Sequence, residues 1–428
     1  MTMKLDRRSM LRWGAGAAAV GALAACSQAT DSSTPAAGGA ASAEQVAQRT
    51  GAGVFDATRL HTLDIAMSDN DFQSIMTAYQ ADRTKDWVEA TVTIDGTAYD
   101  RCGVRLKGNS TIWRVPTGAT ASEYPWLVRL DKFVDGQAHE GVTEIVVRLN
   151  NTTTALNEAL SLDLLARAGL ASEPWCYAAV SVAGAAPVLR LILEQPSKPW
   201  VKRTFAADGI LYKAEAQGNY DYLGDDPAAY DDRFDVEAGE DDLAPLIAFL
   251  KWVNEIDDTG FASGLAEQVE VDAFATYLAL EDLIGNYDAM DGPGNNSYLW
   301  RASSTKRMTV VGWDHNLTFG VSNRPGGGQG LGGQGGGGRP GAGEGMGGGG
   351  ANRGNQSGNV LSRRFEAIPA LAQLKTAATQ RLREDLFTSG YAAQSLERAA
   401  SVLTSSAAQF VAADTVAIEK AAIAAYFG

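Results

Sequence analysis

The chain has 428 residues, of which 45% are hydrophobic and 20% are charged, and its formal net charge is −15. This composition is ordinary for a globular protein and excludes wholesale disorder, a fibrous repeat and a polytopic membrane protein. The acidic balance argues against a nucleic-acid partner, because phosphate binding needs a basic face. Three cysteines do not make a disulfide framework in a chain of this length, and three histidines leave little room for a histidine-based zinc site.

The N-terminus has the features of an export signal. Arg7 and Arg8 are the paired arginines of a twin-arginine signal, and the apolar run Trp13–Ala25 follows them. This run is shorter than the roughly 20 residues that a membrane-spanning helix needs. It ends in Leu23–Cys26, which is typical of a bacterial lipobox, so we expect cleavage before Cys26 and lipid on its thiol. A plain signal peptide with an incidental cysteine is the alternative.

Residues 1–25 are therefore expected to be a signal peptide and residues 26–53 a flexible tether, because the latter lack the aromatic side chains that favour ordering. The protein would then be extracytoplasmic and lipid-anchored to the bacterial cell envelope. Twin-arginine export usually moves folded proteins, so Cys102 and Cys176 would meet oxidising conditions only after folding. The sequence leaves open whether these two cysteines pair.

The first half of the remaining chain is expected to be rich in strands. Ser68 is a predicted N-cap of a helix that ends near Tyr79, and Asp95-Gly96 is a hairpin signal between two strands. Ala155–Ala168 is a predicted amphipathic helix that Gly169 stops. Strands are expected at Arg59–Ile65, Trp87–Ile94, Thr97–Leu106, Trp126–Leu130, Glu144–Leu149, Tyr177–Val182, Val188–Glu194 and Gly209–Lys213.

The second half is expected to be mainly helical, and the whole is therefore of the α+β class. Glu215–Asp242, between the halves, holds eleven carboxylates and one arginine and is expected to be a solvated acidic loop. The hydrophobic pattern predicts helices at Leu243–Ile256, at Val271–Gly285 and from Ser362 onward, and a hairpin of Ser297–Trp300 and Met308–Trp313.

A glycine-rich stretch interrupts the second half. Gly326–Gly350 contains 17 glycines in 25 residues, so we expect a disordered low-complexity insertion at about residues 324–354. The stretch contains no G-x-x-x-x-G-K-[ST] pattern and is therefore not a Walker phosphate loop.

Two acidic segments are candidates for chemistry. Asp288 and Asp291 lie in a loop that leads from a predicted helix to the hairpin, and Asp314 follows that hairpin. Kinases use one aspartate to orient the acceptor hydroxyl, and an asparagine such as Asn296 with a second aspartate to hold Mg²⁺. Oxygen ligands of this kind suit Mg²⁺. Turn residues chosen for local reasons are the alternative.

The strand exit at Arg105, Lys107 and Ser110 combines bases with hydroxyl and amide donors, as a phosphate cradle would. A polar exit from a strand without further function explains it equally well. Glu194 ends one predicted strand and Lys213 lies in another. Each is an ordinary surface charge or, in a kinase-like N-lobe, part of a lysine–glutamate pair that orients the phosphates.

Taken together, these segments resemble the spore-coat CotH kinase family from about Leu60 to the C-terminal helices. Each segment is weak alone, but their order and spacing make the resemblance strong. The carriers are Val104–Thr111, Leu130–Phe133 with Gly136-Gln137, Arg148–Asn151, Leu193–Gln195, Leu211–Lys213, Asn286–Trp300, Trp313-Asp314 and Phe319-Gly320.

The resemblance implies one domain over residues 54–428 with an atypical protein-kinase-like fold, a β-rich N-lobe at about 54–215 and a helical C-lobe at 243–428. It implies phosphate transfer from ATP to Ser or Thr of secreted or envelope proteins with Mg²⁺ or Mn²⁺. The residues implied are Asp288 as the catalytic aspartate, Asp314 and Asn296 as metal ligands, and Lys107, Arg105, Ser110, Glu194 and Lys213 at the nucleotide.

Two positions depart from the family pattern. The strand Tyr124–Leu130 lacks the lysine that relatives often carry, leaving Arg129 as the nearby base, and Met290 stands where relatives tend to have an aromatic residue. A non-catalytic surface or scaffold module that retains the fold is therefore one alternative. A metal-dependent hydrolase that uses the same carboxylates is another.

Overall fold

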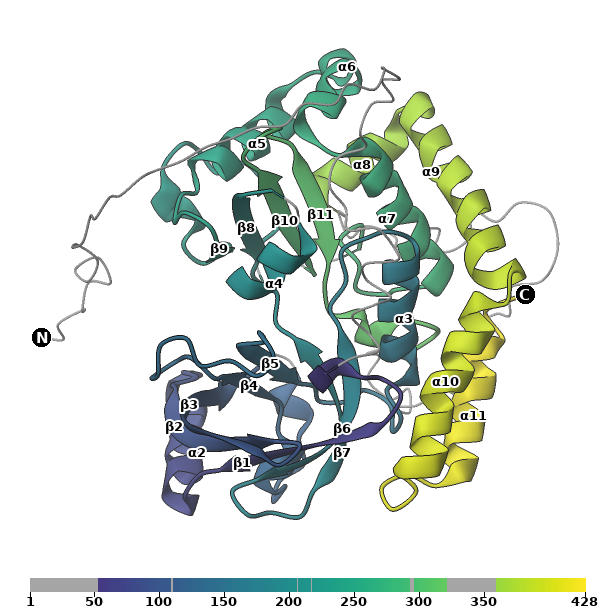
Figure 1. Cartoon of the computed structure of the whole chain (residues 1–428). Coiled ribbons are helices and arrows are strands. Elements are labelled where there is room, and N and C mark those ends of the chain that lie inside the picture. Colours follow the sequence, from purple (N-terminus) through teal and green to yellow (C-terminus); the bar gives the residue numbers. More distant parts are fainter. Residues whose placement is uncertain (1–52, 109–110, 206, 217, 293–295, 322–358) are drawn as a thin grey trace, which may run out of the picture. The chain divides into compact units, whose positions relative to one another are not determined.

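The computed structural model describes residues 53–108, 111–205, 207–216, 218–292, 296–321 and 359–428 (Figure 1). Within these ranges the fold is α+β, as predicted, with a closed barrel of seven strands and a second sheet of four strands. Cys26 with the signal peptide and the tether up to residue 52, Ser110 and the glycine-rich insertion lie outside the described residues, so the expectations for them stay predictions.

The barrel has the strand order β1-β2-β3-β4-β5-β7-β6. It closes where β1 runs parallel to β6 and Leu60 lies opposite Tyr177, whereas its other neighbouring strands are antiparallel. Closure removes the free edges that an open sheet would expose. The strands are β1 (Leu60–Ala66), β2 (Val88–Ile94), β3 (Thr97–Leu106), β4 (Trp126–Arg129), β5 (Glu144–Val147), β6 (Trp175–Val182) and β7 (Val188–Glu194).

Local signals determine several elements of the barrel region. Asp95 and Gly96 both have positive φ (47° and 85°), as a tight two-residue hairpin requires between β2 and β3. Ser68 and Asp71 form a capping box at the start of α2 (Asp69–Asp82), which runs slightly beyond the predicted end. Cys102 and Cys176 are both buried and both free, so the described structure contains no disulfide between them.

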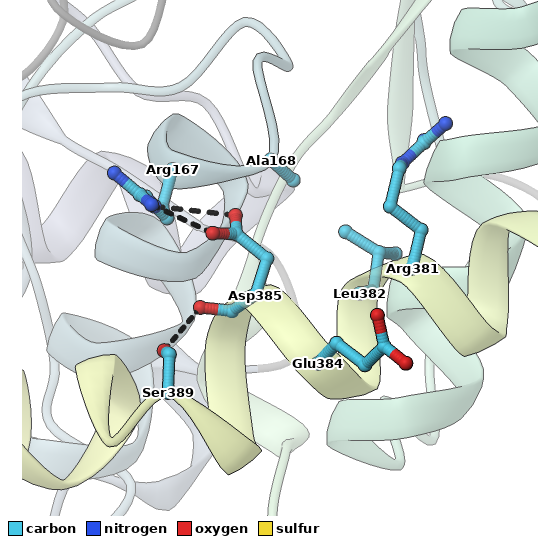
Figure 2. Close-up of a pocket in the computed structure, with 7 residues that line it drawn as sticks. All are labelled: Arg167, Ala168, Arg381, Leu382, Glu384, Asp385 and Ser389. Carbon is cyan, nitrogen blue, oxygen red and sulfur yellow. Dashed lines mark hydrogen bonds and ion pairs between the residues drawn. The ribbon is translucent and has the colours of Figure 1, made fainter.

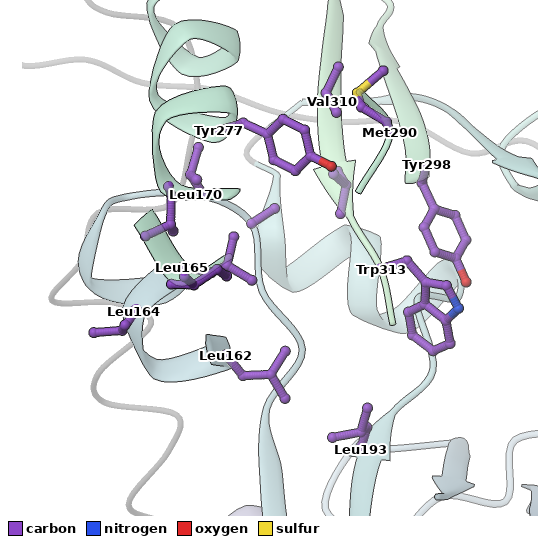
Figure 3. Packing of buried hydrophobic residues seen from close by; sticks show 14 of the residues in the cluster. Leu162, Leu164, Leu165, Leu170, Leu193, Tyr277, Met290, Tyr298, Val310 and Trp313 are labelled. Atoms are coloured by element: carbon purple, nitrogen blue, oxygen red, sulfur yellow. The ribbon is translucent and has the colours of Figure 1, made fainter. Parts of the chain in front are cut away.

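Helix α3 (Leu156–Arg167) connects β5 to β6 and differs from the predicted amphipathic helix. Ten of its twelve residues are buried, and these include the polar Asn157 and Glu158. Its leucines Leu162, Leu164 and Leu165 belong to the same apolar cluster as Tyr277 and Trp313 (Figure 3). A helix that is covered on nearly all sides can keep polar residues only where they have partners. These polar side chains therefore mark a functional or structural network.

The second sheet has the order β11-β10-β8-β9 and is antiparallel throughout. Its strands are β8 (Gly209–Ala214), β9 (Phe234–Ala238), β10 (Ser297–Ala302) and β11 (Met308–Gly312). Two expectations need correction. Strand β8 hydrogen-bonds to β9 and β10, not to the barrel strands of the first half. The predicted acidic loop 215–242 contains β9, in which buried Phe234 and Ala238 flank charged residues and fix the strand to β8.

Helices make up most of the remaining described chain. Helices α4 (Lys198–Thr204) and α6 (Asp258–Gln268) were not expected, whereas the helical C-terminal region is confirmed. In the part of the chain that the structure describes, no helix is long and apolar enough to cross a membrane. The others are α5 (Ala244–Glu255), α7 (Val271–Ile284), α8 (Val360–Ala367), α9 (Pro369–Leu382), α10 (Tyr391–Ser406) and α11 (Ala413–Ala424).

A surface cavity of about 510 Å³ lies beside the π-helical turn Arg383–Thr388 (Figure 2). Arg167 and Asp385, both on its wall, are joined by a 2.6 Å ion pair, so these two opposite charges compensate each other. None of its lining residues is a candidate from the sequence: they are Arg167, Ala168, Arg381, Leu382, Glu384, Asp385 and Ser389. The cavity is therefore not the predicted active site.

Candidate active site

The loop that carries Asp288 is anchored to the end of α7. Gly285 ends this helix in the left-handed region (φ 60°), and the chain then turns through the buried Asn286. The amide Nδ2 of Asn286 donates to Oε2 of Glu281 at 2.7 Å, and its Oδ1 accepts from the backbone N–H of Asp288 at 3.2 Å. Asn286 therefore connects the Asp288 backbone to a buried carboxylate.

Asp288, Asn296 and Asp314, the three residues predicted to form the catalytic and metal site, lie together. Nδ2 of Asn296 donates to Oδ2 of Asp288 at 2.8 Å, although the two residues are separated by a loop. Burial and then the neighbouring Asp314 carboxylate raise the pKa of Asp288. A positive charge nearby would favour the ionised form of Asp288.

The segment that carries Asp314 follows β11 and is held from two sides. Asp314 has a positive φ of 61°, and Nε2 of the following His315 lies 2.8 Å from Oε1 of Glu281. On the other side, Asn157 of α3 donates from Nδ2 to the carbonyl of Asn316 at 2.9 Å. These contacts explain why α3 keeps polar residues in its buried surface.

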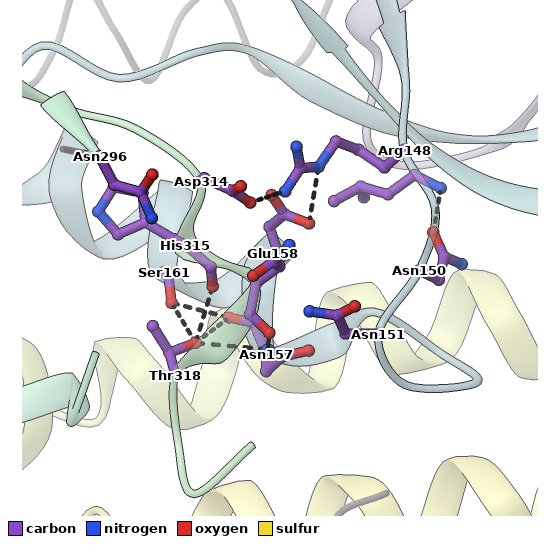
Figure 4. A network of polar contacts seen from close by, with 12 residues as sticks. Arg148, Asn150, Asn151, Asn157, Glu158, Ser161, Asn296, Asp314, His315 and Thr318 are labelled. Carbon is purple, nitrogen blue, oxygen red and sulfur yellow. Dashed lines mark hydrogen bonds and ion pairs between the residues drawn. The ribbon is translucent and has the colours of Figure 1, made fainter. Parts of the chain in front are cut away.

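The two loops are also joined directly through their backbones. The N–H of Tyr287 donates to the carbonyl of Leu317 at 3.0 Å, and the N–H of Phe319 donates to that of Ile284 at 2.8 Å. Ser161 of α3 adds a bond of 3.0 Å to the hydroxyl of Thr318 (Figure 4). The positions of the Asp288 and Asp314 loops are therefore coupled.

Arg148 and Glu158 belong to the site, although the sequence did not assign them a role. Arg148 follows β5, and its guanidinium pairs with Asp314 and, at 2.8 Å, with Glu158 of α3 (Figure 4). Arg148 and Glu158 are both buried. The available signal was a glutamate two residues into a leucine-rich helix, because a charge in such a buried helix requires a partner.

Basic side chains gather around Lys107 beyond the end of β3. Burial and then the charges of Lys213, Arg105 and Arg148 lower the pKa of Lys107 to about 7. Its ammonium lies 5.3 Å from the centre of the Trp313 ring. Nε of Arg105 is buried and has no hydrogen-bond partner among the described residues. Glu237 acts on Lys107 in the opposite sense, but bases that repel one another and a donor without a partner fit an anion such as a phosphate.

The candidates for the nucleotide are thus only partly brought together. Lys107, Arg105 and Lys213 are close enough to act on one another's charge, whereas Ser110 lies outside the described residues. Glu194 is bound by Arg203 of α4, and Lys213 by Glu215. The expected lysine–glutamate pair with Glu194 is therefore not formed, because Glu194 is buried beside α4.

The residues of the site fit a divalent cation. Asp288 and Asp314 supply carboxylate oxygens, and Asn296 supplies an amide oxygen, which are the donors that Mg²⁺ prefers. Among the described residues no group of three His, Cys, Asp or Glu side chains gathers as a metal site. A cation would be held by the Asp314 carboxylate and the Asn296 amide oxygen and would complete its ligands with water.

The model of the CotH kinase protein family matches residues 104–421 of this chain, which is about three quarters of its length. The chain belongs to the CotH kinase family. Inner spore coat protein H of Bacillus subtilis (strain 168) is 25% identical over 197 residues, which cover 44% of this chain and 53% of that protein. The match thus spans about half of the relative's length. The family resemblance of the sequence is confirmed, and every described site residue named above lies within the CotH range.

Proposed function

We propose that this CotH family protein is an ATP-dependent kinase that transfers the γ-phosphate to Ser or Thr of proteins outside the cytoplasm. The observation that carries the proposal is one arrangement of charges. Asp288, Asn296 and Asp314 form an acidic group, and the bases around Lys107 lie at the same site, since Arg148 contacts Asp314 and acts on Lys107. Phosphoryl transfer needs both parts, one for the metal and one for the phosphates. An atypical two-lobe kinase-like arrangement is part of the same proposal.

Each residue has a proposed role. Asp288 accepts the proton of the acceptor hydroxyl while the hydroxyl oxygen bonds to the γ-phosphorus and the bond to ADP breaks. Its raised pKa makes it a better base than an exposed aspartate. Asn296 orients the Asp288 carboxylate through its 2.8 Å bond. Lys107, Arg105 and Lys213 hold phosphate oxygens. A Mg²⁺ or Mn²⁺ ion on Asp314 and Asn296 would supply charge neutralisation on the phosphates when bound.

One observation favours a second candidate function, a non-catalytic scaffold. Arg148 already neutralises Asp314, the proposed metal ligand. A module that never binds metal could keep this ion pair permanently.

The location is proposed from two lines of support. The relative is named a spore coat protein, which suggests an envelope or coat location. The Leu23–Cys26 pattern suggests that lipid on Cys26 anchors the chain to the membrane, with a secreted or envelope protein as substrate and no nucleic acid as partner. Cys26→Ser should release the protein from the membrane fraction and change its processing. Unchanged membrane attachment and processing would refute the anchor.

The kinase proposal is tested with the mature chain carrying Cys26→Ser, radiolabelled ATP and Mg²⁺ or Mn²⁺. We expect label on an envelope protein of the source cell or on the chain itself, and loss of label in Asp288→Asn. Melting temperatures with metal, with ATP and with both should show a shift for the pair that exceeds the sum of the single shifts. If no label is transferred and no such shift is seen, the scaffold function is supported instead.

A further inference from the structure

We propose that Arg148 occupies Asp314 in place of the divalent cation, and that cation binding transfers Arg148 entirely to Glu158. The pair of Arg148 and Glu158 thus gates the metal site. The inference rests on the proposed function only where it takes Asp314 as a metal ligand.

Arg148 is shared between two carboxylates in an unequal way. Its Nη2 lies 2.8 Å from Oε1 of Glu158, and its Nε donates to Oε2 of Glu158 at 3.2 Å. The same Nη2 also pairs with Oδ1 of Asp314. Glu158 therefore holds Arg148 through one hydrogen bond and one ion-pair contact, and its Oε1, which is buried and has no hydrogen bond among the described residues, can accept a further N–H of the guanidinium. Arg148 can give up Asp314 and remain paired.

The three side chains also differ in exposure. The side chain of Glu158 is 2% exposed and that of Arg148 is 9% exposed, whereas that of Asp314 is 25% exposed. An ion arriving from solvent therefore reaches Asp314 before it reaches Glu158. Because Glu158 is buried in α3 and has Arg148 as its ionic partner, it strongly retains that arginine.

Charge determines the direction of the exchange. One arginine facing two carboxylates leaves a net negative charge, which favours a cation at Asp314. Once a doubly charged ion binds there, it repels the guanidinium at contact distance. Arg148 and the ion therefore compete for Asp314, and Glu158 lowers the cost of the exchange by holding the displaced arginine.

This competition predicts that Mn²⁺ affinity changes in opposite directions in a single and a double variant. Glu158→Gln removes the carboxylate that holds the displaced arginine, so Arg148 stays on Asp314 and Mn²⁺ binding should weaken by about fivefold or more. The double variant Arg148→Gln with Glu158→Gln removes the competitor without leaving an unpaired buried charge. In that variant Mn²⁺ binding should tighten by about fivefold or more. A purely structural ion pair would weaken binding in both.

The experiment measures Mn²⁺ binding to the mature chain by electron paramagnetic resonance without nucleotide, so that no activity is required. The part of the Mn²⁺ signal that is lost in Asp314→Asn is assigned to ions bound at the site. Arg167→Gln is the matched control, because Arg167 lies on the same helix as Glu158 and forms an exposed ion pair with Asp385. Circular dichroism of every variant confirms folding.

Weaker binding in Glu158→Gln together with tighter binding in the double variant supports the gate. Unchanged or weaker binding in the double variant, while Asp314→Asn loses the ion, overturns the gate and leaves the kinase proposal intact. Asp314→Asn that binds Mn²⁺ like the unmodified chain overturns both the metal role of Asp314 and the gate.

Discussion

Glu281 and Asn286 are joined by a 2.7 Å hydrogen bond between the carboxylate Oε2 and the amide Nδ2. The other oxygen of the same carboxylate lies 2.8 Å from Nε2 of His315. Asn286 accepts the N–H of Asp288, and His315 follows Asp314. One buried side chain of α7 therefore anchors both acidic loops of the candidate site.

Glu281→Gln should impair phosphate transfer more than it impairs folding. Glutamine places an amide donor where the carboxylate had an acceptor, so either Asn286 or His315 loses its bond. We expect kcat to fall about tenfold or more and the free energy of unfolding to fall by about 1–3 kcal/mol. Steady-state kinetics and urea unfolding measure the two effects.

The matched control for this variant is Glu270→Gln. Glu270 precedes the other end of α7 and pairs with Arg307 at 3.1 Å, away from both loops. It should keep kcat nearly unchanged. A Glu281→Gln protein with full kcat and reduced stability would show that Glu281 serves packing alone.

Local signals predicted the elements of the fold better than its closure. The Asp95-Gly96 turn and the Ser68 cap depend on neighbouring residues only, and both were confirmed. Barrel closure pairs Leu60 with Tyr177, which are far apart in the sequence, so no local pattern reports it. Strand β9 was not predicted, because the many acidic residues around it obscured the hydrophobic pattern of its two buried side chains.

The same distinction applies to the candidate site. Asp288, Asn296 and Asp314 lie in short motifs that flank one hairpin, and this local arrangement predicted their proximity. The ion pair of Arg148 with Asp314 joins residues 166 positions apart. Glu194 was expected to pair with a lysine as in a kinase-like N-lobe, but its position at a strand end does not determine which neighbour covers it. Here that neighbour is α4.

Lys107 should make nucleotide binding dependent on pH. Its pKa is lowered to about 7 because burial and the nearby bases disfavour its charged form. Phosphates favour the charged form, so the pKa of Lys107 rises when nucleotide binds. Binding therefore takes up a proton above pH 7, and affinity should be highest below pH 7 and fall as pH rises above it. Isothermal titration calorimetry in buffers of different ionisation enthalpy measures both affinity and proton uptake.

Lys107→Arg is the control for this pH dependence, because arginine stays charged throughout the range. Its affinity should change little between pH 7 and pH 9. Equal pH profiles for the two proteins would mean that Lys107 does not titrate at the nucleotide.

The glycine-rich segment should be dispensable for folding. Seventeen glycines in Gly326–Gly350 offer no apolar side chains to bury. Each doubling of loop length changes the closure free energy by only about 0.6 kcal/mol. Replacing residues 324–354 with a short Gly-Ser link should therefore leave the melting temperature nearly unchanged. A large fall in calorimetry would show that the segment packs against the domain.

Asp288 and Asp291 compete for the role of catalytic base, and the structure separates their surroundings. Asp291 has the spacing to Asn296 of a typical kinase H-R-D-x-x-x-x-N loop. However, Asn296 bonds to Asp288, and the charge of Asp314 acts on Asp288. Asp291 instead acts on the buried Tyr277. Burial, then the charge of Glu281 and then that of Asp291 raise the pKa of this phenol. These contacts favour Asp288 over Asp291 for the proposed role of catalytic base.

Three substitutions to asparagine test this assignment. Asp288→Asn should lower phosphate transfer by roughly 10²–10⁴-fold, the range expected for a lost general base, while Mg·ATP still binds. Asp314→Asn should lower phosphate transfer and should also weaken metal binding, because it removes a charged ligand. Asp291→Asn should keep most activity. A radiolabelled-phosphate assay measures transfer, and circular dichroism confirms that each variant is folded. An active Asp288→Asn beside an inactive Asp291→Asn would reverse the assignment. Three active variants would refute the kinase proposal, because the loss of the base alone, or of the metal carboxylate alone, should already impair phosphate transfer.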